Sequence, residues 1–195
     1  MTKFYTGVGS RDTPEDVLSV MRDLSRIYRE MGWTLRSGGA RGADTAFEEN
    51  AGDLKEIYLA NSDETIDKFS YDKAQRLASM YHPAWLRLPE YSKKLLTRNA
   101  FQVMGAKMDN PSDLIICWTK DGCISHYTRD IHTGGTGDME SVFRDCLASV
   151  SKKVIGLLPR ALFISACVIA MGTWGKMQCP LPYHSLTESS ILDKN

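Results

Sequence analysis

The sequence has no excess of charge of either sign, because 24 Lys and Arg residues balance 24 Asp and Glu residues. Proteins that coat nucleic acids usually carry a clear basic excess, so we expect no such surface, although a local basic groove stays open. Long apolar runs are lacking too. The longest uncharged stretch, 161–175, is shorter than the roughly 20 residues that cross a bilayer, so we expect no contact with a membrane.

Cysteine is sparse, and its pattern lacks any C-x-x-C pair. The five cysteines are odd in number, which is typical of reduced thiols and not of a disulfide framework; they are Cys117, Cys123, Cys146, Cys167 and Cys179. The chain passes from Met1 almost directly into a predicted strand, which leaves no space for a signal peptide. The sequence therefore predicts a cytoplasmic protein.

What the chain does contain is an alternation of short apolar runs and helical periodicities. The runs predict buried strands at 4–8, 33–35, 56–60, 114–118 and 154–158. Helices are predicted between them, from an N-cap at Thr13 to a stop at Gly32, at 44–50, over most of 61–112 with a break at 82–83, and at 138–149. This order predicts an α/β fold, a Rossmann-like open parallel sheet with helices on both faces. We expect this domain to span 1–158. The extension 159–195 either packs on it or joins an oligomer interface.

Two glycine-rich turns, at 37–44 and 133–137, each follow a predicted strand and precede a helical segment. Glycine allows a backbone to approach a ligand closely, and the N–H groups at a helix start favour an anion such as phosphate. A third turn ends the first strand, where open α/β sheets bind ligands. The alternative for each turn is tight packing without a ligand. The predicted ligand-binding residues are Gly7, Gly9, Ser10, Arg11, Ser37, Gly38, Gly39, Arg41, Gly42, Asp44, Gly134, Gly135, Thr136 and Gly137.

The segment 119–131 reads as a long polar loop placed before the last of these turns. Loops of this length are often functional, so we expect it to act as a lid over a ligand. Four potential metal ligands occur in or directly beside it, namely Cys123, His126, Asp130 and His132. Their spacing fits neither a helix face nor a zinc knuckle, and we predict no metal site and no cofactor.

The three turns together resemble the SLOG superfamily of Rossmann-like proteins, which includes the DNA-processing protein A (Smf) family and the Lonely Guy-type phosphoribohydrolases. The likeness covers 1–158, and its most specific part is the octet 37–44. A second likeness points to the phosphoribohydrolases, because Thr97-Arg98-Asn99 is similar to their arginine segment. By that resemblance Arg98 and Glu140 are candidate catalytic residues. The position that matches the family's glutamate is Ser141, and Glu140 falls one residue early.

The resemblance implies a protein that binds a nucleotide or nucleotide-derived small molecule, for sensing, sequestration or processing of a signal, in a phage or bacterial setting. Two alternatives stay open. One is N-glycosidic cleavage of a nucleoside 5′-monophosphate with Arg98 and Glu140; on position alone, Arg98 fits a surface helix equally well, and an acid such as Glu140 is common in a first helical turn. The other is single-stranded DNA binding, which the balanced charge disfavours. We also expect a homo-oligomer.

Overall fold

The structure, a computed structural model, describes residues 2–61, 66–120 and 153–156. Its strands form one parallel sheet in the order β3-β2-β1-β4-β5. The strands are β1 (Phe4–Gly9), β2 (Thr34–Ser37), β3 (Lys55–Ile57), β4 (Leu114–Trp118) and β5 (Lys153–Gly156). The helices are α1 (Glu15–Glu30), α2 (Ala43–Ala51), α3 (Lys68–Tyr81) and α4 (Glu90–Met104), with a short 3₁₀ helix η1 (Trp85–Arg87) between the last two.

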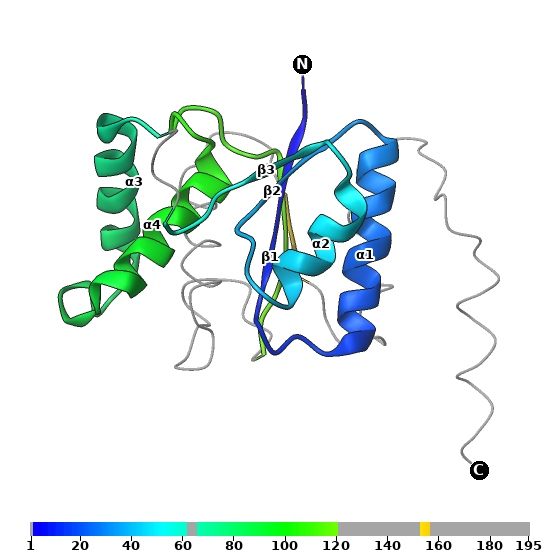
Figure 1. The fold of residues 1–195 in the computed structure, drawn as a ribbon, viewed down its shortest axis with the longest axis horizontal. Helices are drawn as coiled ribbons and strands as arrows, with labels where there is room; N and C mark the ends of the chain where they lie inside the picture. Colours follow the sequence, from blue (N-terminus) through cyan, green and yellow to red (C-terminus); the bar gives the residue numbers. More distant parts are fainter. Residues whose placement is uncertain (1, 62–65, 121–152, 157–195) are drawn as a thin grey trace, which may run out of the picture.

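The helices lie on both sides of the sheet. Figure 1 shows α1 and α2 together beside one face, and α3 and α4 beside the other. This arrangement confirms the predicted α/β fold with an open parallel sheet. The strands differ in detail from the prediction: β3 ends at Ile57 and not at residue 60, and β5 begins one residue earlier than expected.

Local signals explain where α1 ends. Met21, Leu24 and Tyr28 recur at three- and four-residue spacing and pack into the core from one face of the helix. At its end, Gly32 has φ +75°, its N–H donates to the Arg29 carbonyl, and the next N–H donates to the Tyr28 carbonyl. These two bonds form a Schellman motif, which needs a left-handed residue and so favours glycine.

The start of α1 differs from the prediction that Thr13 is its N-cap. Pro14 holds that place, with ψ 149° and a carbonyl that accepts from the Leu18 N–H at 2.9 Å. The Thr13 hydroxyl instead donates to the Ser10 carbonyl at 2.7 Å. That bond closes the turn after β1 on itself, so the threonine orders the turn and does not cap the helix.

The helical hairpin on the second face contains the predicted break at 82–83. Asp67 caps α3 by accepting the N–H and the hydroxyl of Ser70, and these two hydrogen bonds lower the pKa of its carboxyl group. The apolar side chains of α4 are unevenly buried: Val103 is fully buried, whereas Tyr91 is 55% exposed. The buried side chains of α4 lie in its second half, where it packs on the sheet, and they include polar ones.

Candidate functional site

The strand order places a topological switch point between β1 and β4. From β1 the chain builds outward through β2 to β3, and it then returns to the other side of β1 as β4. In open α/β sheets, ligands bind beyond the carboxyl ends of the strands at such a point. Gly9 pairs with Trp118 at this edge, and the segments that leave these two strands begin at Ser10 and Thr119.

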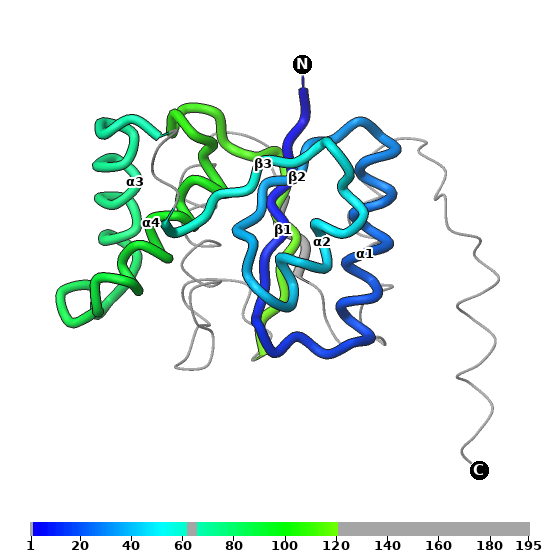
Figure 2. The backbone as a smooth tube through the Cα atoms, viewed as in Figure 1, coloured from blue at the N-terminus to red at the C-terminus, as the bar shows by residue number. Residues whose placement is uncertain are grey.

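The turns that follow β1 and β2 meet at this edge of the sheet. Figure 2 shows the chain leaving β1 for α1 and β2 for α2 at the same end. Gly42 has φ +90°, and a Cβ atom there would come within 2.8 Å of the carbonyl oxygens of Ser10 and Arg11. The Ala43 N–H also donates to the Ser10 carbonyl at 3.4 Å. Glycine at position 42 therefore allows the two turns to touch.

Two arginines project from these touching turns. Arg11 and Arg41 are exposed, and neither forms an ion pair with any residue that the structure describes. Ser10, on the same turn as Arg11, accepts the Asp12 N–H with its hydroxyl at 3.1 Å. The edge thus presents two cations close to the switch point that have no ion-pair partner within residues 2–61, 66–120 and 153–156.

A buried ion pair lies at the end of β2. Nη1 of Arg98 on α4 donates to Oδ2 of Asp44 on α2 at 3.2 Å, and the two residues are only 9% and 3% exposed. Because α2 and α4 cover opposite faces of the sheet, this pair joins the two helix layers around its carboxyl edge. Sequence reasoning named both residues and missed that they contact one another, since they are 54 positions apart.

Burial is the main influence on the pKa of Asp44. It raises the pKa of Asp44 from 3.8 to about 6, although the charge of Arg98 and the Ala40 N–H act in the opposite direction. Glu48, one helical turn further along α2, adds a smaller repulsion that raises the Asp44 pKa further. A carboxyl group whose pKa lies this close to neutrality is typical of functional sites.

Gly38 provides the space for the arginine. A Cβ atom at this position would fall 1.1 Å from Nη1 of Arg98 and 2.9 Å from Oδ2 of Asp44, so a larger residue displaces the pair. Within the described residues, the Nε atom of Arg98 and the Ser37 hydroxyl are buried and have no hydrogen-bond partner. Unsatisfied buried polar groups are rare in native proteins and call for an explanation, such as water or a ligand.

Two carboxylates of the same chain already accept hydrogen bonds from the turn that was predicted to bind an anion. Oε1 of Glu48 accepts the Gly39 N–H at 2.9 Å, and Oδ2 of Asp44 accepts the Ala40 N–H at 3.2 Å. Sequence reasoning did not single out Glu48. Its position four residues after Asp44, on the same face of α2, is the signal that was available.

Two of the predicted glycines have packing roles in β1. A Cβ atom on Gly7 would lie 2.5 Å from the Phe47 ring, and one on Gly9 would lie 2.7 Å from the Cβ of Ala43. Both contacts bring α2 down onto the strand. Their predicted contact with a ligand stays a prediction, and the structure gives each of them a packing reason as well.

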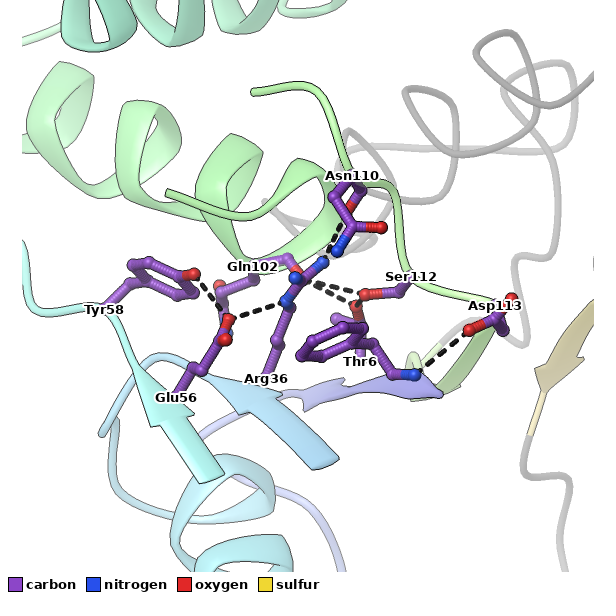
Figure 3. Close-up of polar contacts among 9 residues, drawn as sticks. Thr6, Arg36, Glu56, Tyr58, Gln102, Asn110, Ser112 and Asp113 are labelled. Carbon is purple, nitrogen blue, oxygen red and sulfur yellow. Dashed lines mark hydrogen bonds and ion pairs between the residues drawn. The ribbon is translucent and has the colours of Figure 1, made fainter. Parts of the chain in front are cut away.

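A second polar cluster lies between the sheet and α4 (Figure 3). The buried Arg36 side chain donates to Oε2 of Glu56 at 2.8 Å and to the Asn110 carbonyl at 2.6 Å. Beside it, the Thr6 hydroxyl contacts the Gln102 carbonyl at 2.7 Å and the Ser112 hydroxyl at 2.9 Å. The Thr6 bond to Gln102 joins β1 to α4, and the Arg36 bond to Asn110 joins β2 to the segment that follows α4, so the cluster helps to position the helix that carries Arg98.

Several predicted features lie outside the described residues. They are the turn residues Gly134, Gly135, Thr136 and Gly137, the candidate Glu140, the predicted helix 138–149, nearly all of the loop 119–131 and the extension 159–195. The structure places the remaining predicted residues at or near one edge of the sheet. It joins Asp44 to Arg98 and the Gly42 turn to Ser10 and Arg11.

Comparison with protein-family models, with curated proteins and with solved structures finds no significant match. Among the described residues, no helix is long and apolar enough to cross a membrane, and no three His, Cys, Asp or Glu side chains gather as metal ligands. The cytoplasmic location and the oligomeric state stay predictions.

Proposed function

We propose that the protein binds a nucleotide or a nucleotide-derived small molecule at the carboxyl ends of β1, β2 and β4. The observation that carries this proposal is the contact between two turns at Gly42, which brings the exposed cations Arg11 and Arg41 to one edge beside the switch point. Arginine suits phosphate because its planar guanidinium donates several hydrogen bonds in a fixed geometry. The SLOG resemblance points to the same class of ligand.

The buried pair of Asp44 and Arg98 supports the same assignment. Two charges taken out of water are a weak source of stability, because desolvation offsets most of their attraction. Such a pair is better explained by the precision with which it holds the turn after β2 and the second half of α4. In this proposal Arg98 is a positioning residue for the site.

Binding without turnover is the form of the proposal that the described residues favour. In the glycosidase alternative, Arg98 assists a leaving base, yet its charge here is neutralised by Asp44 and its side chain is buried. We therefore expect no free base when the protein is incubated with nucleoside 5′-monophosphates. Rapid release of base that is lost in Arg98→Ala would replace this proposal by the enzymatic one.

The test of binding begins with the small molecules released from the purified, denatured protein, identified by mass spectrometry. Isothermal titration then measures the affinity of the released compound and of the common ribonucleotides. We expect the double variant Arg11→Ala, Arg41→Ala to bind at least tenfold more weakly, because charge-assisted bonds to phosphate are lost.

The matched control for this loss of charge is Arg26→Ala. Arg26 is exposed, pairs with Asp23, and lies in the second half of α1, which leads back to the opposite edge of the sheet. It should leave the affinity unchanged. Equal affinity in the double variant and the control, or no binding by any ribonucleotide, would contradict the proposal.

A further inference from the structure

The two N–H groups that open the turn after β2 are already satisfied by carboxylates of the same chain. Gly39 donates to Oε1 of Glu48 at 2.9 Å and Ala40 donates to Oδ2 of Asp44 at 3.2 Å. A phosphate arriving at these groups would have to displace a carboxylate of its own charge sign. The turn therefore disfavours the phosphate that its glycines predict.

The same contacts leave one carboxylate oxygen of Glu48 unused within the described residues. Glu48 uses one carboxylate oxygen on the Gly39 N–H, and its other oxygen, Oε2, forms no hydrogen bond with the described part of the chain. Gly39 itself is exposed, so this position is open to a ligand. A carboxylate with an unused oxygen binds hydroxyl donors strongly, since its hydrogen bonds are charge-assisted.

We propose that this turn holds the sugar of the ligand, with the carboxylate of Glu48 accepting its vicinal hydroxyls, while the phosphate lies toward Arg11 and Arg41. This inference rests on the proposed function and assigns a part of the ligand to a part of the site. It makes Glu48 a specificity-determining residue that distinguishes a ribose from a deoxygenated sugar.

Two further features of the turn fit a nucleoside. Leu59 is 49% exposed and its Cδ2 atom lies 2.7 Å from the position of a Cβ on Gly39, which provides apolar surface beside the acceptor. Independently, the guanidinium of Arg98 lies against the neighbouring Gly38 with its buried Nε unpartnered among the described residues. That unmet donor marks the turn as a built polar site and not only a strand–helix connection.

A bound cation is the other ligand that two carboxylates attract. Asp44 is already paired with Arg98, so Glu48 is the carboxylate at this turn that forms no ion pair within the part of the chain that the structure describes. The described residues contain no group of three potential metal ligands. A single carboxylate of this kind is better suited to accept hydrogen bonds from sugar hydroxyls than to bind a metal cation.

The experiment compares four ribonucleoside 5′-monophosphates with their 2′,3′-dideoxy counterparts by isothermal titration, on the full chain. For the best-binding base we expect the ribose form to bind about tenfold more tightly, the size of one or two hydrogen bonds to a charged acceptor. Glu48→Ala should lose most of that preference, and Glu48→Gln should retain a part of it because its amide oxygen still accepts a hydrogen bond.

The control is Glu49→Ala, which removes the same charge from the neighbouring exposed position of α2 and should keep the full preference. Unfolding midpoints of the variants show that each is folded. Binding with no preference for ribose, or tighter binding of both forms by Glu48→Ala, overturns the sugar assignment alone. Absence of binding by every ribonucleotide overturns the proposed function and this assignment together.

Discussion

Both faces of the sheet bury apolar clusters, and they differ in how many polar side chains are buried beside those clusters. Against α1 and α2 the strands place Tyr5, Leu35 and Ile116, which are fully buried in an apolar core around Phe47. Against α4, β1 and β2 place Thr6 and Arg36, which are buried just as deeply, beside an apolar cluster that contains Ile115 of β4 and Val103 of α4. Alternation along a strand sends neighbouring residues to opposite faces, so one short strand serves both environments.

The difference lies in what each face specifies. Apolar packing on the first face supplies stability that grows with buried area and depends little on direction. The polar cluster on the second face requires directed bonds, such as those from Arg36 to Glu56 and to the Asn110 carbonyl. We infer that apolar packing on both faces stabilises the domain, whereas the polar cluster on the second face fixes the position of α4 and thus of Arg98.

The largest effect on stability is expected from a substitution in the apolar core between the sheet, α1 and α2. Phe47→Ala removes a fully buried ring that packs on Gly7 and Tyr5, and should lower the free energy of unfolding by about 4 kcal/mol. Urea denaturation measures it. The control Phe69→Ala removes a ring that is 79% exposed and should change stability by less than about 0.5 kcal/mol. Similar losses in both variants would contradict the assignment of the core.

The junction between the faces should respond to pH. Because the pKa of Asp44 rises from 3.8 to about 6 on folding, the folded state keeps this proton where the unfolded chain has lost it. The stability that the bound proton contributes is complete below pH 4 and is lost as the pH rises to about 6. Relative to Asp44→Asn, the protein should lose up to about 3 kcal/mol across this window.

Urea denaturation of both proteins at several pH values from 4 to 7 measures this difference. The asparagine variant cannot ionise at this position. The difference in unfolding free energy between the two proteins therefore removes the contribution of all other titrating groups. A stability difference that does not change with pH, or that changes with the opposite sign, would show that burial does not raise the pKa of Asp44.

The smallest of the three effects on stability is expected in the polar cluster between the sheet and α4. Arg36→Met keeps an unbranched side chain but removes the bonds to Glu56 and Asn110 and the stacking of the guanidinium 3.8 Å from the Phe4 ring centroid. We expect the free energy of unfolding to fall by about 2 kcal/mol. The effect is limited because the half-exposed Glu56 regains contact with water. The variant should also weaken ligand binding, since α4 carries Arg98. A stability loss with unchanged affinity would separate the polar cluster from the site.

Much of the fold was predictable because its signals are local. The Schellman end of α1 at Gly32, the fully buried β4 and the break between α3 and α4 all depend on residues adjacent in sequence. The error at Thr13 has a tertiary cause, because its hydroxyl bonds to the turn after β1 and not to the helix. The burial of Arg98 on α4 also has a tertiary cause, because its charge is paired with Asp44 of α2.

The sequence by itself determined the alternation of elements, the parallel sheet and the glycine turns, because periodicity and turn chemistry are properties of short segments. Only the tertiary structure decided that Arg98 pairs with Asp44 and that Glu48 takes the N–H group of Gly39. Contact between α2 and α4 depends on how the helices pack around the sheet, and no pattern within either helix encodes it. The same packing raises the pKa of Asp44, since desolvation arises only when distant segments exclude water together.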